Sequence, residues 1–403
     1  MPYNLAAPER DIEELVVRRA EVFREKQGIN LLTGHCAHTI DSGNRIVSGS
    51  TLDDKKFELP YDRLLIATGG NPIVPELPGF DLPGIITLKT LGDGRYLKTI
   101  LKTTAVKKAV LVGMGYINLE MCEALVSLGI DVDMVKPGPI FLPWLEPSMA
   151  QSIKEEIESR QVGIHAGHTI ERIEKTGDRL QVICPDLKLA GDLVIVGIGI
   201  RPNSAMAADA GLELSVGQSI ATDRRACTSD GNIYAAGDCA DAYHVVSGQK
   251  TWIPLALRAN RAGWAVADNI CGKNAELDGV AGTAVFKVFD FEVARTGLTA
   301  AEAAEAGFEP VENMIKARSK AHGHPGSSPI QVNLVGDKKT GRLLGAQMTG
   351  KDGVAHRING PAVALQCGMT VKQYSQTDLA YAPPIGPTWD PTLTAANQLL
   401  KKL

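Results

Sequence analysis

The clearest pattern in this chain is an apolar run that ends in a glycine-containing turn and continues as a helical repeat. Ala109–Val112 are all apolar, Gly113 and Gly115 follow closely, and residues 118–128 place apolar side chains at helical spacing. A second strand-like run, Asp131–Val135, comes next. The order strand, turn, helix, strand predicts a βαβ unit.

On the N-terminal side of this unit, the spacing of apolar residues over 8–27 predicts a helix, followed by a small sheet. Residues 63–68 predict a buried strand that enters a turn at Gly69, and the proline-rich stretch 72–83 predicts an irregular crossover. We expect the strands of the small sheet at residues 30–33, 39–41, 45–47 and 56–59.

On the C-terminal side, the pattern predicts a helix over 147–160 and another from about residue 257. From residue 284 the sequence contains longer runs rich in β-branched residues, which predict an α+β unit without a glycine-rich loop. Short strands are expected at residues 163–165, 170–174, 180–184 and 193–197, and longer ones at 285–289, 330–335 and 342–348.

The glycine turn has the chemistry of a dinucleotide fingerprint. Gly113 and Gly115 let the backbone turn sharply and approach a pyrophosphate, whose charge the N-terminus of the following helix would hold. The third position of the motif holds Asn118 in place of glycine, a modest increase in size where helix and strand pack. Tyr116 and Glu120 follow in the same helix, and the whole pattern predicts a nucleotide site.

Lys136 stands at the end of the next strand, where an acidic residue would normally bind the adenosine ribose of NAD. A cation there does not repel a 2′-phosphate, so the sequence admits NADPH as well as NADH. The alternative is that Lys136 points to solvent and carries no information about the cofactor.

A second motif, residues 233–238, places a carboxylate directly after a short apolar strand and Gly237. Asp238 is therefore predicted to hydrogen-bond the ribityl chain of a flavin, the alternative being a turn or helix-capping aspartate. Pro254-Leu255-Ala256 opens a later helix whose amides would face the flavin ring. Two such motifs in one chain indicate two nucleotide cofactors that face each other.

Composition narrows the class of protein. The 403 residues exceed one ordinary domain, and a net charge of −4 gives no reason to expect nucleic acid or a membrane as partner. No apolar run approaches the roughly 18–20 residues of a membrane span, and the first residues do not resemble a signal peptide. Seven cysteines without a Cys-x-x-Cys pair indicate a reducing cytoplasm.

Two further segments carry candidate chemistry. His322-Gly-His324 is the only close histidine pair, and without further ligands at suitable spacing it predicts a polar loop and no metal site. Tyr381-Ala-Pro-Pro is a rigid turn that presents an aromatic ring. This ring either packs at a subunit interface or lies close to a substrate.

Four motifs in a fixed order give the chain a family resemblance: Ala-Thr68-Gly69, Gly113-x-Gly115-Tyr-Ile-x-Leu-Glu120, Gly199-Ile-Arg-Pro-Asn and Ile-Tyr-Ala-Ala-Gly237-Asp238. With them the chain resembles the pyridine nucleotide-disulfide oxidoreductases. Further segments are similar to a narrower branch that contains coenzyme A-disulfide reductases, NADH oxidases and CoA-dependent persulfide or sulfur reductases; they surround Pro254, Phe286, Arg357 and Tyr381.

The resemblance implies an α/β fold with two Rossmann-like nucleotide-binding domains, one for FAD and one for NAD(P)H, and a C-terminal α+β dimerisation domain. The FAD domain would occupy residues 1–104 and 222–282, the NAD(P)H domain 105–221 and the dimerisation domain 283–403. The resemblance also implies a cytoplasmic homodimer that uses FAD and NADH or NADPH, with coenzyme A as a further candidate ligand.

The same resemblance implies a set of site residues. Tyr381 and His324 would face the substrate. The cofactor-binding residues would be Thr68, Gly69, Gly113, Gly115, Tyr116, Glu120, Lys136, Gly199, Gly237, Asp238, Pro254, Leu255 and Ala256.

Members of the family carry a redox-active cysteine just before a triplet like Met1-Pro2-Tyr3, and a first βαβ unit upstream of it. We therefore expect the catalytic cysteine to lie before Met1 and the chain to be N-terminally truncated. His324 and Ile385 stand where CoA-disulfide reductases often carry tyrosines, which weakens a strict CoA-disulfide assignment.

The resulting prediction is an FAD-dependent NAD(P)H oxidoreductase that reduces a CoA-disulfide, persulfide or sulfur acceptor, or dioxygen as an NADH oxidase. One alternative is a truncated, non-catalytic remnant that folds and dimerises without flavin. Another is a flavoprotein that passes electrons to a protein partner, which the Tyr381-Ala-Pro-Pro turn disfavours.

Overall fold

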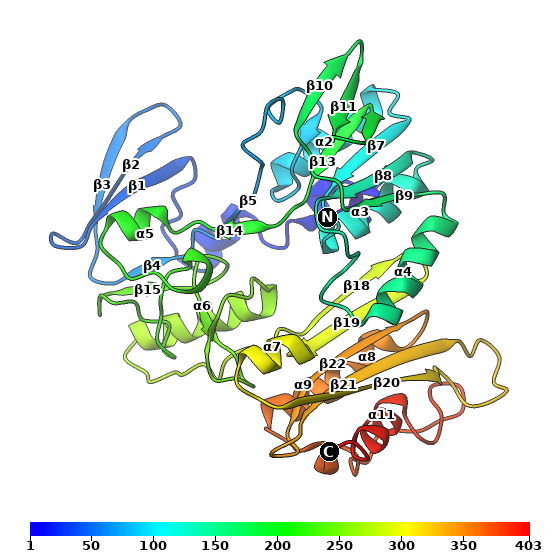
Figure 1. Cartoon of the computed structure of the whole chain (residues 1–403). Helices are drawn as coiled ribbons and strands as arrows, with labels where there is room; N and C mark the ends of the chain where they lie inside the picture. Colours follow the sequence, from blue (N-terminus) through cyan, green and yellow to red (C-terminus); the bar gives the residue numbers. More distant parts are fainter.

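The computed structural model describes all 403 residues and places them in three regions, seen at the left, upper right and bottom of Figure 1. The left region is built from two stretches of sequence, one on each side of the upper right region. The bottom region is formed by the C-terminal residues alone. This arrangement confirms the predicted α/β class with a separate C-terminal α+β unit.

Short sheets make up the left region. Strands β1–β3 form an antiparallel meander, and β4 pairs in parallel with β15, although the two are far apart in sequence. Helix α6 packs its small apolar residues against the end of β15. The elements are β1 (His35–Asp41), β2 (Ile46–Thr51), β3 (Lys56–Pro60), β4 (Leu64–Ile66), β5 (Gly70–Pro72), β14 (Ile200–Pro202), α5 (Ala205–Asp209), η3 (Val216–Gln218), β15 (Ile233–Ala235), β16 (Ala242–Tyr243), β17 (Lys250–Thr251) and α6 (Ala256–Ile270).

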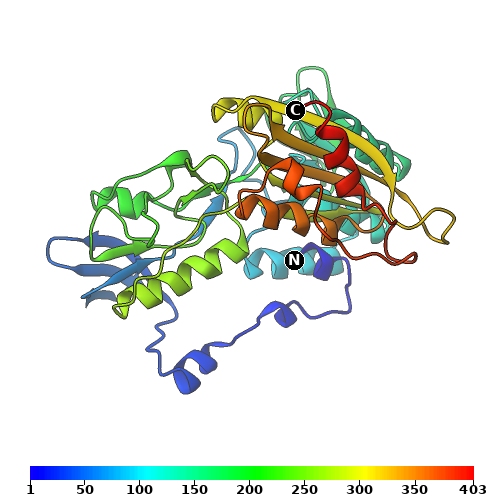
Figure 2. The same cartoon turned by 90° about the horizontal axis from the view of Figure 1, so that it is seen from below.

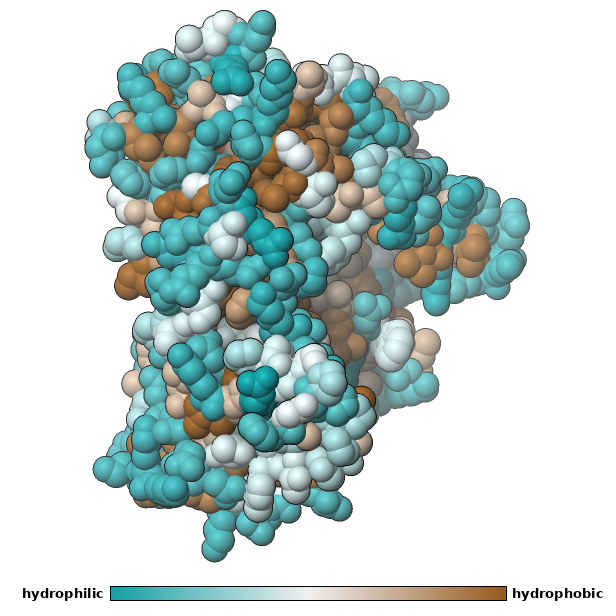
Figure 3. Space-filling view, turned by 90° about the vertical axis from the view of Figure 1, so that its right-hand side faces the viewer, coloured by the Kyte–Doolittle hydropathy of each residue, from teal (hydrophilic) through white to brown (hydrophobic).

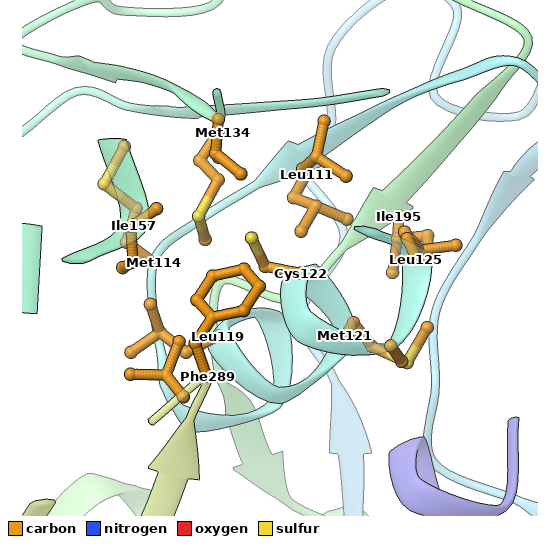
Figure 4. Packing of buried hydrophobic residues seen from close by; sticks show 14 of the residues in the cluster. Leu111, Met114, Leu119, Met121, Cys122, Leu125, Met134, Ile157, Ile195 and Phe289 are labelled. Carbon is orange, nitrogen blue, oxygen red and sulfur yellow. The ribbon is translucent and has the colours of Figure 1, made fainter. Parts of the chain in front are cut away.

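A parallel five-stranded sheet with the order β6-β13-β7-β8-β9 forms the upper right region. The apolar run of β7 is buried on both faces: Ala109 and Leu111 pack in the core around α3, and Val110 and Val112 pack against β10–β12. Figure 4 shows the core around α3. The elements are β6 (Ile85–Ile86), α2 (Leu91–Thr103), β7 (Lys108–Val112), α3 (Tyr116–Ser127), β8 (Asp131–Lys136), α4 (Pro147–Ser159), β9 (Gly163–Ala166), the antiparallel β10 (Arg172–Thr176), β11 (Arg179–Ile183) and β12 (Lys188–Gly191), and β13 (Leu193–Val196).

The predicted βαβ unit is therefore confirmed as β7–α3–β8. The parallel sheet begins earlier than the boundary expected at residue 105, because β6 already pairs with β13. Helix α2 between them starts with a capping box at Thr90 and Asp93.

The bottom region is an antiparallel sheet with the order β18-β19-β22-β21-β20. Helices α8–α11 cover it and bury a second large core. The elements are β18 (Ala284–Val288), β19 (Phe291–Gly297), α7 (Ala300–Glu305), β20 (Pro310–Arg318), β21 (Pro329–Asp337), β22 (Leu343–Gly350), α8 (Val354–Arg357), α9 (Asn359–Gln366), α10 (Val371–Tyr374) and α11 (Pro391–Leu399).

The predicted helix over residues 8–27 is wrong. The structure has α1 (Pro2–Leu5), one 3₁₀ turn at Ile12–Leu15 and one π turn at Val22–Lys26, and Figure 2 shows this segment running outside the body of the protein. Of the predicted apolar stripe only Ile12 is buried. A helix of this length needs a packed face for stability, and here only Ile12 is buried, against Gly94 of α2. The strand expected at 30–33 is also absent, since the first strand is β1.

The surface carries its apolar residues in separate groups. On the face shown in Figure 3, hydrophilic residues cover most of the area and the larger hydrophobic groups lie in the upper part. None of the helices combines the length and apolar character needed to span a membrane.

Candidate functional site

A two-stranded antiparallel ribbon joins the left and upper right regions. β5 pairs with β14, and the Asn203 amide donates to the Gly69 carbonyl at 2.9 Å. The Thr68 hydroxyl donates to the Asn203 carbonyl at 2.5 Å. The ribbon therefore brings Thr68 and Gly69 next to the segment that contains Gly199, two motifs that are separate in sequence.

The fingerprint turn at Gly113 lies against the same segment. Gly113 has φ +96°, and a methyl group placed on it would lie 2.5 Å from the Gly197 carbonyl oxygen. Only glycine combines this backbone angle with this close approach. Gly115 follows as the N-cap of α3 and provides no capping side chain, so the first amides of the helix are free to bind an anion.

Asn118, the departure from the glycine motif, has a structural reason. Its side chain is completely buried, and its amide donates to the carbonyls of Val112 and Gly113 at 2.8 and 2.9 Å. The space for it comes from Gly197, where an added methyl group would lie 2.4 Å from the Asn118 Oδ1. These two hydrogen bonds fix the backbone of the fingerprint turn from the buried side of α3.

The Asp238 loop lies at the other end of the ribbon, beside Gly70. A methyl group placed on Gly70 would lie 3.6 Å from the Asp238 Cβ, so the loop is in contact with the end of the Thr68–Gly69 turn. The Asp238 carboxylate forms an ion pair with Lys89 at 2.9 Å. Its backbone carbonyl accepts a hydrogen bond from the Trp252 indole at 2.9 Å. This carboxylate is therefore paired with a cation rather than capping a helix.

Arg258, in the first turn of α6, ties down the rest of the loop. Its guanidinium donates to the carbonyls of Gly237 at 2.8 Å and Ala240 at 3.0 Å, and also to that of Asp241. Leu255 is the N-cap of α6 and supplies no capping side chain. The uncapped start of α6, at Ala256, is in this way held beside the Gly237–Asp238 turn.

The sequence analysis missed Lys89, Trp252 and Arg258. Lys89 directly precedes the capping box of α2, a signal that sequence does contain, but its pairing with Asp238 spans 149 positions. Nothing local in the sequence indicates such a contact.

Tyr116 and Glu120 follow the fingerprint turn on α3. The Tyr116 ring stacks on Phe286 with 4.8 Å between centroids and meets Trp144 edge-on at 5.5 Å. Burial raises the pKa of Tyr116 and of Glu120. Glu120 accepts a hydrogen bond from the Tyr3 hydroxyl at 2.9 Å.

Lys136 is partly buried. Its ammonium turns back and donates to the Ile140 carbonyl at 2.9 Å, and desolvation lowers its pKa. The positive charge is thus fixed at the C-terminal end of β8, where the ribose of a bound dinucleotide lies in Rossmann-type sheets.

Replacing Lys136 with glutamate should lower the ratio of catalytic efficiency with NADPH to that with NADH by about tenfold, because a carboxylate repels the 2′-phosphate. Steady-state rates of flavin reduction with both nucleotides measure this ratio. Lys107→Glu, at the opposite end of the sheet, is the matched control. An unchanged ratio in Lys136→Glu would remove Lys136 from the cofactor site.

The two predicted substrate residues lie in the bottom region. The Ala321 amide donates to the Pro383 carbonyl at 3.2 Å, which joins the loop of His324 to the loop of Tyr381. Tyr381 is half exposed, and the His324 ring forms a hydrogen bond with the Pro325 carbonyl at 2.9 Å. Their role toward a substrate stays a prediction.

The buried Arg357 holds this pair of loops in place. Its guanidinium binds the Asp390 carboxylate at 2.8 Å and donates to the carbonyls of Ser319 at 2.9 Å and Ile385 at 3.2 Å. A fourth hydrogen bond goes to the Gly353 carbonyl at 3.0 Å. One side chain therefore connects the end of β20, the start of α8, the Tyr381 loop and the start of α11.

The residues present suit a dinucleotide at the α3 turn, and the ribityl chain and ring of a flavin at the Asp238 loop. The N-termini of α3 and α6 are both uncapped, and no atom lies within 4 Å of the position where a Gly69 side chain would begin. The described residues before β4 form no strand–glycine–helix unit of the kind that holds an FAD pyrophosphate. The expectation that this unit and a catalytic cysteine lie upstream of Met1 stays a prediction.

All seven cysteines are free, and only three of them are fully buried: Cys122, Cys184 and Cys239. No group of three or more histidine, cysteine, aspartate or glutamate side chains is placed to hold a metal ion.

Comparison with known proteins decides the family. Residues 2–263 match the family described as pyridine nucleotide-disulphide oxidoreductase, and residues 283–391 match the dimerisation domain of the same family. The chain belongs to the pyridine nucleotide-disulphide oxidoreductases. As a member of this family it is an FAD- and NAD(P)H-dependent oxidoreductase that carries a dimerisation domain.

Three similar proteins illustrate the branch of this oxidoreductase. An NAD(P)H sulfur oxidoreductase (CoA-dependent) of Pyrococcus furiosus is 34% identical over 96% of this chain and 87% of its own length. An NADH oxidase of Methanocaldococcus jannaschii is 31% identical over 100% of this chain and 90% of its own. The structure of an NAD-dependent persulfide reductase from A. fulgidus superposes with a TM-score of 0.94 at 34% identity, covering 100% of this chain and 75% of that one.

These relatives confirm the predicted branch. Nothing among them favours a non-catalytic remnant over an oxidoreductase.

Proposed function

We propose that this oxidoreductase takes a hydride from NADH or NADPH at the α3 turn and reduces a persulfide, elemental sulfur or a CoA-disulfide, with dioxygen as a second acceptor. The observation that carries the proposal is the β5–β14 ribbon. The Gly113 turn contacts the chain just before β14, and the Asp238 loop contacts Gly70 at the other end of the ribbon. A dinucleotide and a flavin bound there would place the nicotinamide ring against the flavin ring.

The residues of this chain have separate tasks in the proposed reaction. The free amides of α3 would bind the dinucleotide pyrophosphate. Lys136 would lie beside the adenosine ribose, where NADPH carries its 2′-phosphate. Asp238 and its ion-pair partner Lys89 would orient the flavin. Trp252 and Arg258 would hold the loop that carries Asp238. When bound, FAD supplies the two-electron chemistry, and the uncapped start of α6 supplies a positive dipole that stabilises its reduced, anionic form.

For the acceptor, the similarity to sulfur and persulfide reductases supports a sulfur–sulfur bond as substrate. In the proposed arrangement residues 1–104 and 222–282 form the FAD domain, 105–221 the NAD(P)H domain and 283–403 the dimerisation domain of a homodimer. A cytoplasmic setting is supported by seven cysteines that form no disulfide.

The test is the visible spectrum of the purified chain with excess FAD, followed by anaerobic addition of NADPH or NADH. We expect a bound-flavin spectrum that NAD(P)H bleaches and dioxygen restores; the same chain preceded by the cysteine-bearing segment of the family should also recover with a persulfide or a CoA-disulfide. Asp238→Ala is the matched variant and should lose bound flavin. A wild-type chain that stays colourless, or a flavin that NAD(P)H does not bleach, would contradict the proposal.

A further inference from the structure

The short helix α1 is fixed on the NAD(P)H-side helix α3, and Figure 1 shows the N-terminus beside α3. Pro2, Asn4 and Leu5 are buried in this contact. Tyr3 lies between them and is half exposed, so the packing of α1 does not depend on its ring. Its hydroxyl instead reaches across and donates to Glu120 Oε1 at 2.9 Å.

Glu120 is a partly buried carboxylate without a basic side chain as its partner. It lies on the same side of α3 as Tyr116 and Glu123, because residues four and seven positions apart share a helix face. Glu123 is neutralised by Lys287 at 2.7 Å and accepts the Phe289 amide at 2.9 Å. Glu120 forms no ion pair with a basic side chain, and among side chains only Tyr3 donates to it.

The charges around Glu120 act in opposite directions. Burial raises its pKa and the Glu123 carboxylate raises it further, whereas the hydrogen bond from Tyr3 and the amino group of Met1 lower it. Lys287, on the strand packed against α3, is engaged by Glu123. Among the side chains around Glu120, the Tyr3 hydroxyl is therefore the one that favours the ionised carboxylate.

We infer that Tyr3 is a positioning residue for the NAD(P)H half of the reaction, which acts by holding the Glu120 carboxylate in place beside Tyr116. A carboxylate there can accept the amide hydrogens of a nicotinamide carboxamide and can face the positive charge of the oxidised ring. Because Tyr3 belongs to α1, this contact joins the N-terminal segment to the helix that binds the dinucleotide. The inference rests on the function proposed above.

The experiment compares Tyr3→Phe with the wild-type chain, both loaded with FAD. Anaerobic stopped-flow measures flavin bleaching by NADH per bound flavin across pH, and carbon-13 NMR of the cofactor-free protein measures the pKa of the Glu120 carboxyl. We expect the rate to fall about two- to tenfold, the worth of one hydrogen bond. The Glu120 pKa and the acid limb of the rate profile should both move to higher pH, because the phenol no longer stabilises the carboxylate.

Two further variants complete the test. In a Glu120→Ala background, Tyr3→Phe should have no additional effect on the rate, and Tyr96→Phe on α2 should behave like the wild type. An unchanged Glu120 pKa in Tyr3→Phe, or additive effects in the double variant, would overturn the inference while leaving the proposed function intact. A loaded wild-type flavin that NADH does not bleach would instead overturn the proposed function and the inference with it.

Discussion

Gly113→Ala should weaken NAD(P)H binding by about tenfold to a hundredfold, the worth of one hydrogen bond between an α3 amide and a charged pyrophosphate. The added methyl group would lie 2.5 Å from the Gly197 carbonyl oxygen, at a backbone angle that alanine disfavours. The turn must therefore move, and the amides of α3 move with it. Quenching of protein fluorescence by added NADPH and NADH measures the affinity.

Gly129→Ala provides the control because it separates backbone strain from steric clash. Gly129 follows α3 at its other end with φ +76°, and no atom lies within 4 Å of an added methyl group. This variant should lose about 1 kcal/mol of stability and keep its nucleotide affinity. Equal affinities for Gly113→Ala and the wild type would place the dinucleotide elsewhere.

Arg357→Ala should lower the free energy of unfolding of the C-terminal region by about 3–5 kcal/mol, the usual cost of removing one partner from a buried ion pair. The guanidinium is only 4% exposed, and its loss leaves Asp390 without a cation. The carbonyls of Ser319, Gly353 and Ile385 lose their donor as well. Denaturant unfolding followed by circular dichroism measures the change.

Arg318→Ala, one residue from Ser319, is the control for this experiment. Arg318 is exposed and its guanidinium bonds only to Ser327, so its removal should cost less than about 1 kcal/mol. Arg357→Lys should recover only part of the stability lost in Arg357→Ala, since an ammonium cannot reproduce the planar set of donors of a guanidinium. If Arg357→Ala unfolds like the wild type, the four contacts do not hold the Tyr381 loop.

The fold could be predicted wherever local pattern and tertiary packing agree. The unit β7–α3–β8 was readable because its apolar run is buried on all sides and its turn needs glycine. Residues 8–27 have an equally regular apolar stripe, yet Ile12 is its only buried member and no helix of that length forms. Periodicity alone does not say whether a partner surface exists.

In the candidate site, too, the residues of local motifs could be predicted and their long-range partners could not. Glycines and Asp238 could be predicted because their chemistry is local to short motifs. The partners that hold them could not, since Lys89 pairs with Asp238 across 149 positions and Tyr3 meets Glu120 across 117. Such contacts exist only once the regions have assembled.

The pairing of β4 with β15 has a consequence for the order in which this protein matures. Arg63 and Asn232, which flank this pair, are 169 positions apart, whereas β7, β8 and β9 follow one another along the chain. At about 5–20 residues per second, synthesis on the ribosome supplies β15 many seconds after β4. The pyridine nucleotide half can therefore become protease-resistant on the nascent chain, and flavin loading must wait until the second half of the message has been translated.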